Sequence, residues 1–176
     1  MNTFTLLFVT ALACSVLTQL WLSRRHQAHV RAHRERVPDA FAGRIPLDDH
    51  HKAADYTVTR NRLGMIELVY GSALLLAWTL GGGLEWLDQA WRGLALGPLY
   101  TGTAVMLSAM FIMSLLDLPF SLYNTFVIEE RFGFNRTTPG TYISDLVKQV
   151  LLALAIGAPM ILLALWIMES SGELWW

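Results

Sequence analysis

Four long apolar runs, separated by charged segments, limit the folds that are open to this chain. The runs cover residues 3–22, 63–80, 99–120 and 150–168. Each is close to the roughly 20 residues that a helix needs to cross about 30 Å of hydrocarbon. Because backbone groups inside lipid must hydrogen-bond to one another, the runs predict membrane-spanning helices. We therefore expect an all-α, multi-pass transmembrane domain with about four spanning helices.

The composition agrees with a membrane protein. Hydrophobic residues make up 54% of the chain and charged residues 15%, which excludes an ordinary soluble domain. The formal net charge of −1 gives no reason to expect a nucleic-acid partner, so the lipid bilayer is the expected surrounding. Cys14 is the single cysteine and has no intramolecular disulfide partner.

The distribution of Lys and Arg predicts the topology. Nine of these residues lie in 23–62 and three in 121–149, whereas Arg92 lies alone between the second and third runs. Basic segments stay on the inside of a membrane. The segments 23–62 and 121–149 are therefore predicted to be inside, with both termini outside. The basic cluster follows the first run instead of preceding it, which favours an uncleaved helix over a secretory signal.

Two connecting segments carry patterns of their own. The inside segment 23–62 combines basic residues with Pro and Gly turns, and we interpret it as a linker because it has too few large apolar residues for a core. Between the second and third runs, apolar and charged residues alternate at helical spacing. This pattern predicts a short helix lying in the outside membrane interface. Its apolar residues are Leu84, Leu87, Trp91 and Leu94, and its charged residues are Glu85, Asp88 and Arg92.

The last apolar run is predicted to belong to a longer helix that starts before the bilayer. Thr138 is a good N-cap, and Pro139 suits the first helical position. A helix from Pro139 to Met168 would be roughly 45 Å long at 1.5 Å per residue. Gly157 and Pro159 are expected to bend it, since proline removes a backbone donor.

Two acidic residues at membrane depth, Glu67 and Asp117, are candidates for polar sites because charges there are costly. Asp117 ends a helical stripe formed with Met106, Met110 and Met113. The stripe fits the wall of a polar chamber or a groove for a lipid-modified peptide. It fits equally a packing face whose carboxylate reaches interfacial water. For Glu67 a structural role is the preferred interpretation.

Three histidines at helical spacing, His26, His29 and His33, raise the possibility of a metal site. Arginines 24, 25, 31 and 34 surround them, and these cations oppose binding of a divalent ion. No Glu supplies the base that a hydrolytic zinc helix carries between its ligands. We therefore expect a basic juxtamembrane helix that meets anionic lipid headgroups.

Residues 118–135, Leu-Pro-Phe-Ser-Leu-Tyr-Asn-Thr-Phe-Val-Ile-Glu-Glu-Arg-Phe-Gly-Phe-Asn, are the most informative segment. They predict a helix that leaves the bilayer and ends in a turn at Gly133. By itself the Glu-Glu-Arg cluster is typical of a solvated helix face. The alternative is that it lines a functional surface, because the neighbouring aromatic residues create a partly apolar setting in which each charge needs a partner.

This segment closely resembles the juxtamembrane element of the type I CAAX prenyl proteases, which are integral-membrane zinc metalloendopeptidases. The resemblance implies that the chain is an amino-terminal membrane domain, spanning residues 1–176, that forms part of an intramembrane chamber wall and a peptide groove. The resemblance also implies seven residues as candidates for contact with the substrate or with the protease domain. They are Asp117, Tyr123, Asn124, Glu129, Glu130, Arg131 and Asn135.

The zinc motif of that family, His-Glu-x-x-His, does not occur in these 176 residues. Catalytic and metal-ligating residues are therefore not expected in this chain, and zinc is expected only in the complete enzyme. The resemblance implies two partners, a carboxy-terminal protease domain and a peptide or protein substrate, and it leaves open whether that substrate is prenylated. It favours a fragment of a longer protein. The alternatives are a natural four-span protein and, in function, a non-enzymatic adaptor that binds a partner protein or a lipidated peptide.

Overall fold

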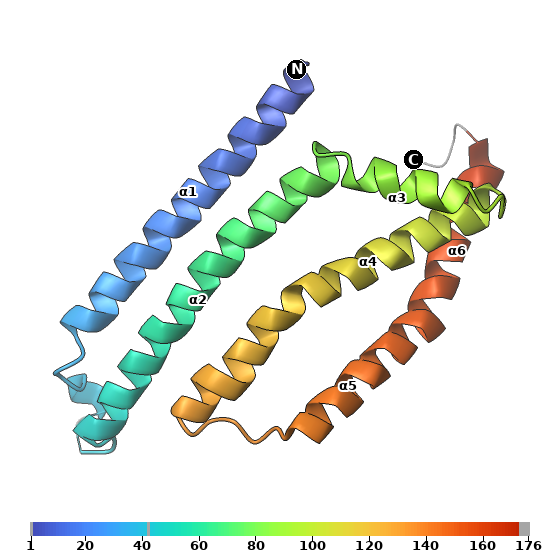
Figure 1. Cartoon of the computed structure of the whole chain (residues 1–176). Helices are drawn as coiled ribbons and strands as arrows, with labels where there is room; N and C mark the ends of the chain where they lie inside the picture. The colour runs from blue at the N-terminus through green and yellow to red at the C-terminus, as the bar shows by residue number, and fades with distance from the viewer. Residues whose placement is uncertain (1, 42, 173–176) are drawn as a thin grey trace. The chain divides into compact units, whose positions relative to one another are not determined.

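Helices and short connections make up the whole of the described chain. A computed structural model describes residues 2–41 and 43–172 (Figure 1). Its elements in chain order are α1 (Thr3–Ala32), η1 (Asp39–Phe41), α2 (Leu47–Thr79), α3 (Gly83–Arg92), α4 (Pro98–Tyr123), η2 (Asn124–Glu129), α5 (Pro139–Leu152), η3 (Ala153–Gly157) and α6 (Ala158–Ser171). Over these ranges no strand is present, so the all-α prediction is confirmed.

Three helical stretches are long and apolar enough to cross a membrane. They are Thr3–Ala32, Pro98–Glu129 and Pro139–Ser171, and they contain three of the four predicted runs. The fourth run, 63–80, lies at the end of α2. It qualifies only when α2 and α3, which are bent by 49° at their junction, are taken as one span. The chain is thus a multi-pass membrane protein with three or four spans.

The basic segment after the first run is more helical than we expected for a linker. α1 continues to Ala32 and α2 begins at Leu47, so only 33–46 connects them, with one short 3₁₀-helix. The sequence from Ser23 to Ala32 contains neither Gly nor Pro. Nothing therefore interrupts the first helix where its apolar part ends.

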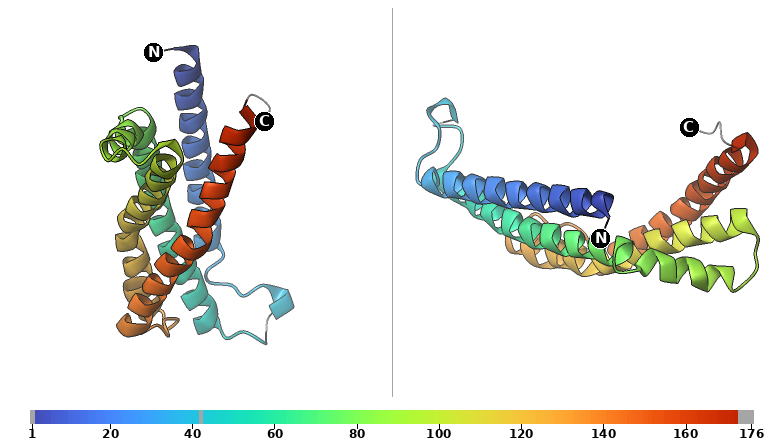
Figure 2. Two further views of the ribbon diagram at one scale, coloured as in Figure 1. Left: turned by 90° about the vertical axis from the view of Figure 1, so that its right-hand side faces the viewer. Right: turned by 90° about the horizontal axis from the view of Figure 1, so that it is seen from above.

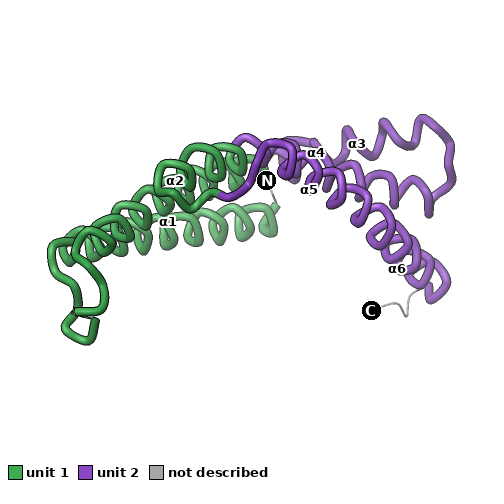
Figure 3. The backbone as a smooth tube through the Cα atoms, turned by 90° about the horizontal axis from the view of Figure 1, so that it is seen from below, with its two compact units in different colours: residues 1–75, 120–135 green, residues 76–119, 136–176 purple. Residues whose placement is uncertain are grey.

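The described helices form two units, shown in different colours in Figure 3. The first unit contains Met1–Leu75 and Phe120–Asn135, and the second contains Leu76–Pro119 and Arg136–Trp176. The division falls inside α2 and inside α4, which continue through it as helices.

In the first unit, α1 and α2 lie side by side (Figures 1 and 2). Gln27 is only 6% exposed, and its Nε2 donates a hydrogen bond to Asn61 Oδ1 over 2.8 Å. Two residues beyond Ala32, the Arg34 guanidinium donates two hydrogen bonds of 2.9 Å to the Asp55 carboxylate. These two contacts fix which face of α1 is turned toward α2.

The hydrophobic core of the first unit joins α2 to the segment that follows α4. Leu63, Ile128 and Phe132 are its buried members, and Ile128 is only 2% exposed. Tyr56 and Phe120 pack against them. We call residues 118–135, which resemble the juxtamembrane element of the protease family, the family-like segment. Its own apolar side chains therefore hold it to α2.

In the second unit, the short helix α3 confirms the amphipathic pattern. Leu87 is buried, and Trp91 Nε1 donates a hydrogen bond of 2.9 Å to Ser108 Oγ on α4. Asp88 and Arg92 form an ion pair on the exposed side. Leu84 is 43% exposed, and Leu94 lies beyond the end of the helix and is exposed as well, so neither of these two predicted residues adds to the buried apolar face. That α3 lies in the membrane interface stays a prediction.

The long last helix begins as predicted, because Thr138 accepts a hydrogen bond from the Thr141 amide and Pro139 occupies its first turn. A π-helical turn, η3, replaces α-helix directly before Pro159. Proline has no N–H to complete the α-helical ladder, which explains an irregular turn at this place.

Candidate functional site

The site is built around a π-helical turn that continues α4. The turn, η2, contains both Asn124 and Glu129. Asn124 Nδ2 donates a hydrogen bond of 2.9 Å to Glu129 Oε1. The other amide atom, Asn124 Oδ1, is buried and has no hydrogen-bond partner among the described residues. Single π-helical turns inside α-helices are frequent at functional sites.

A tight turn follows and folds the chain back over the end of the helix. Phe134 N donates to Glu129 O over 2.8 Å, and Asn135 N donates to the same carbonyl over 3.2 Å. Gly133 makes this turn possible because its φ of +70° lies in the left-handed region. The turn brings Asn135 Nδ2 within 2.9 Å of Glu130 Oε2, to which it donates.

Aromatic side chains attach the turn to α2. The Tyr56 ring meets Phe132 and Phe134 edge to face, with centroid distances of 5.5 and 5.0 Å. Lys52 Nζ lies 5.2 Å from the centroid of Phe134. Edge-to-face pairs and cation–π contacts are favourable geometries, so both ends of the turn are fixed to a neighbouring helix.

The structure brings together four of the predicted site residues as two pairs, Asn124 with Glu129 and Glu130 with Asn135. Amide side chains of the same segment are thus the donors to both carboxylates. Arg131, which is the nearest cation in sequence, instead places its guanidinium carbon 5.8 Å from the Phe132 ring centroid.

The remaining predicted site residues are not gathered at these pairs. Tyr123 ends α4 and is 50% exposed. Glu67 is half-buried on α2. Asp117 belongs to the second unit and is exposed, and Met106 and Met110 of its stripe are exposed as well.

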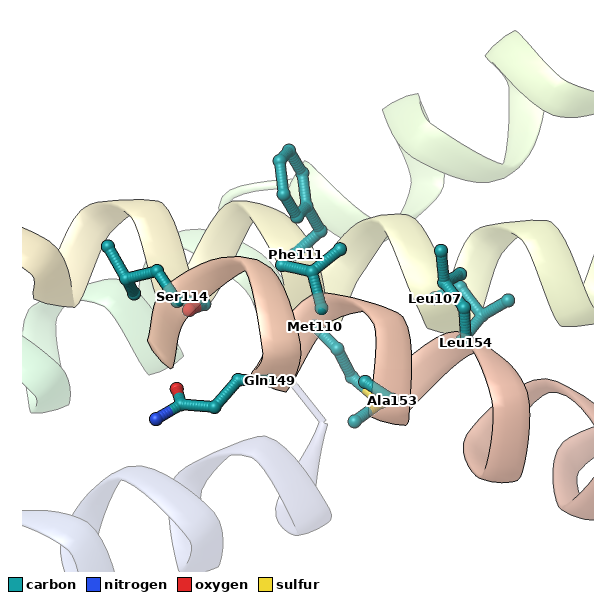
Figure 4. Close-up of a pocket in the computed structure, with 9 residues that line it drawn as sticks. Leu107, Met110, Phe111, Ser114, Gln149, Ala153 and Leu154 are labelled. Carbon is teal, nitrogen blue, oxygen red and sulfur yellow. The ribbon is translucent and has the colours of Figure 1, made fainter. Parts of the chain in front are cut away.

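A groove in the second unit includes Met110, one residue of the stripe for which the sequence allowed either a groove or a packing face; the partner helix and the other lining residues were not predicted. It runs between α4 and the α5–η3 helix and has a volume of about 270 Å³ (Figure 4). A second hollow of about 250 Å³ continues it and shares Phe111, Ser114, Leu146 and Val150 with it. The lining of the first hollow is Leu107, Met110, Phe111, Ser114, Leu146, Gln149, Val150, Ala153 and Leu154. The helical spacing within 107–114 and 146–153 was a usable signal, but only structure pairs the two faces.

Ion pairs join the segment that follows α1 to the first turns of α2. Arg34 contacts both Glu35 and Asp55, and His51 Nε2 lies 3.1 Å from Glu35 Oε2. Hydrogen bonds from Arg34 hold the pKa of Asp55 and of Glu35 below their ordinary values. These groups lie outside the apolar runs. Glu35 and Asp55 are exposed, whereas Arg34 and His51 are partly buried, so solvent screening still keeps the energetic effect of the ion pairs modest.

Among residues 2–41 and 43–172, no three His, Cys, Asp or Glu side chains are placed so that they could hold a metal ion. The described residues thus offer no ligand set of their own for the zinc that the resemblance implies for the complete enzyme.

Comparison with known proteins agrees with this architecture. The chain is 31% identical over 170 residues to a CAAX prenyl protease 1 homolog of Caenorhabditis elegans, covering 94% of this chain and 37% of the relative. It is 29% identical over 180 residues to the Mus musculus homolog, covering 95% and 37%. The chain thus spans little more than a third of the length of these relatives.

A solved structure shares the fold. The crystal structure of S. mikatae Ste24p superposes with a TM-score of 0.84 at 22% identity, covering 97% of this chain and 40% of that one. Residues 26–176 match the family described as CAAX prenyl protease N-terminal, five membrane helices. This match covers most of the chain, which therefore belongs to the CAAX prenyl protease N-terminal family.

Proposed function

We propose that this chain is the membrane domain of a CAAX-type zinc metalloendopeptidase, in which it forms part of the intramembrane chamber wall and of the groove for the peptide substrate. The paired carboxylates in the family-like segment carry this proposal. Each is held by an amide donor through one oxygen, and each has a second oxygen that can accept a peptide N–H.

The rigidity of the segment supports a role in positioning. Ile128 and Phe132 are buried against α2, and Tyr56 contacts two of its aromatic rings. A substrate-orienting group must be held closely by its surroundings to be effective. A solvated surface cluster needs no such support.

The hydrolytic step belongs to the complete enzyme. Zinc, when bound there, would polarise the scissile carbonyl and activate water. This chain would contribute binding and orientation. In the same proposal both termini are outside and the basic segments 23–62 and 121–149 are inside, which places the paired carboxylates at the inside mouth of the chamber.

The groove of the second unit favours a second candidate function. Its lining is almost entirely apolar, with Ser114 and Gln149 as the polar exceptions. Such a groove suits the hydrocarbon part of a lipidated peptide. An adaptor that binds this peptide without cleaving it would use the same surface.

A chimaera tests the proposal. The part of the Caenorhabditis elegans homolog that aligns with this chain is replaced by these 176 residues, and cleavage of a prenylated CAAX peptide is measured with and without a zinc chelator. We expect zinc-dependent cleavage. A chimaera that purifies as a folded, zinc-loaded protein but cleaves nothing would contradict the protease assignment. If that inactive chimaera bound the peptide, the adaptor would be favoured.

A further inference from the structure

One face at the inside end of α1 carries a basic and aromatic surface that neither the packing of the chain nor the proposed function uses. We call it the headgroup patch and define it as Trp21, Arg25, His26, His29 and His33. At 3.6 residues per turn these positions fall on one side of the helix, roughly opposite Gln27. Gln27 is turned toward α2 by its hydrogen bond to Asn61, so the patch points away from α2.

Three residues of the patch, Arg25, His26 and His29, line an open, shallow hollow of about 290 Å³ together with Leu22. The guanidinium carbon of Arg25 lies 5.6 Å from the Trp21 ring centroid. This cation–π contact holds the Arg25 side chain against the helix surface next to Trp21. The rings of His29 and His33 are 4.2 Å apart. Every residue of the patch is exposed.

The charge of the patch is not compensated by its own helix. The first acidic residue of the chain is Glu35, which pairs with Arg34 and His51. In the part of the chain that the structure describes, Arg25 forms no ion pair. The patch thus offers an uncompensated cation with polar rings beside it.

The position along α1 matches the depth of lipid headgroups. The apolar run 3–22 covers roughly the 30 Å of hydrocarbon, and the headgroup region adds several Å beyond it. Arg25 to His29 lie one to two turns after the run, which is roughly 5–10 Å at 1.5 Å per residue. Trp21 stands at the boundary, where tryptophan is enriched.

We propose that the headgroup patch is a binding site for the phosphate of an anionic phospholipid in the inside leaflet. The hollow is apolar at Leu22, toward the span, and polar from Arg25 onward, as a phospholipid is apolar in its tails and charged in its head. Arginine binds phosphate oxygens through two parallel N–H donors, and the histidine rings supply further donors. The adjacent arginines oppose a divalent metal at the same place.

The test measures lipid binding to the purified chain in nonionic detergent by native mass spectrometry. The two probes are dioleoyl phosphatidylglycerol and dioleoyl phosphatidylcholine, which share their tails and differ in net charge. We expect tighter binding of phosphatidylglycerol. Arg25→Gln should lower this preference about five-fold, because one basic residue near an anionic surface is worth roughly 1 kcal/mol.

Arg24→Gln is the matched control, since Arg24 lies at the same depth and is also exposed but faces away from the hollow. It should leave most of the preference intact. His29→Gln, at a second exposed position, should weaken the preference in the same direction as Arg25→Gln. Equal losses in the Arg24 and Arg25 variants would overturn the proposal, because they would show unspecific attraction by the basic segment.

A competition measurement with a soluble phosphate compound distinguishes a lipid ligand from a soluble phosphate ligand. Glycerophosphoglycerol carries the same phosphodiester without the acyl tails and should not compete at concentrations equal to those of the lipid. Competition at equal concentration would assign the site to a soluble phosphate ligand and would overturn the lipid assignment.

Discussion

Asn124 Nδ2 donates to Glu129 Oε1 over 2.9 Å although the two residues are five positions apart on a continuous helix. In an α-helix, positions five apart point in directions that differ by roughly 140°. The π-helical turn η2 widens the helix, and its i to i+5 spacing aligns the two side chains. Glu129 therefore has its donor within its own turn and is oriented before any partner arrives.

Asn124→Ala should destabilise the chain, because it leaves the half-buried Glu129 carboxylate without its amide donor. Leaving such a group unsatisfied costs about 1–3 kcal/mol. The measurement is thermal unfolding in detergent. Gln19→Ala is the control, since Gln19 also donates to a side chain of its own helix but is exposed, and it should change stability by less than about 0.5 kcal/mol. If both variants change the melting temperature equally, the Asn124–Glu129 hydrogen bond in η2 has no special structural role.

Glu130→Gln in the chimaera should reduce peptide cleavage more than Glu85→Gln does. Glu130 accepts from Asn135 in the family-like turn, whereas Glu85 accepts from Gln89 on the exposed side of α3. Both pairs join a carboxylate to an amide, so the two substitutions remove the same charge from similar bonds. We expect about a ten-fold or larger loss for Glu130, equivalent to about 1.4 kcal/mol. Equal and negligible losses would return Glu130 to an ordinary solvated face.

Phe132→Ala should loosen the family-like turn from α2. Phe132 is 8% exposed and contacts both the Leu63 core and the Tyr56 ring. Truncating a buried Phe costs about 3–5 kcal/mol. Phe4→Ala is the control because Phe4 is 76% exposed. Thermal unfolding should separate the two variants clearly, and similar melting temperatures would contradict the core described above.

The stabilising effect of the Arg34–Asp55 pair should disappear in acid. Arg34 lowers the pKa of Asp55 in the folded chain below its ordinary value of 3.8. A depressed carboxyl pKa stabilises the fold above the ordinary value, and this stabilisation is lost as the pH falls through the folded pKa.

Unfolding of the wild type and of Asp55→Asn, compared between pH 7 and pH 3, checks this prediction. The wild type should be more stable than Asp55→Asn at pH 7, and this difference in stability should decrease below about pH 4. High salt should also reduce this difference in stability, because the pair is partly exposed to solvent. An Arg34→Gln, Asp55→Asn double-mutant cycle isolates the pair. If the difference in stability between the wild type and Asp55→Asn does not change with pH, the ion pair is not its cause.

Single cysteines at Glu85 and Gly140 in a Cys14→Ala background should label from opposite sides of the membrane. Both positions are exposed, and they lie on either side of the span Pro98–Glu129. The expected result follows from the twelve Lys and Arg residues in 23–62 and 121–149 against the single Arg92. Labelling of both cysteines from the same side by an impermeant reagent would overturn the topology.

Several local features could be read from the sequence because each depends on neighbouring residues. The apolar runs predict the spans by length, and Thr138 with Pro139 predicts the start of α5. Gly133 was expected to end the helix before it, and its φ of +70° confirms this. The amphipathic pattern predicted α3, which is bounded by glycines.

Other features required the tertiary structure because they join residues that are distant along the chain or break the α-helical period. The contact of Tyr56 with Phe134 links α2 to a turn that comes after α3 and α4 in the chain, and no local rule predicts this contact. The groove is lined by residues of α4, such as Phe111, together with residues of α5, such as Val150, which are distant in the sequence. A period of 3.6 residues would separate Asn124 from Glu129, so their pairing was decided by the π-helical turn.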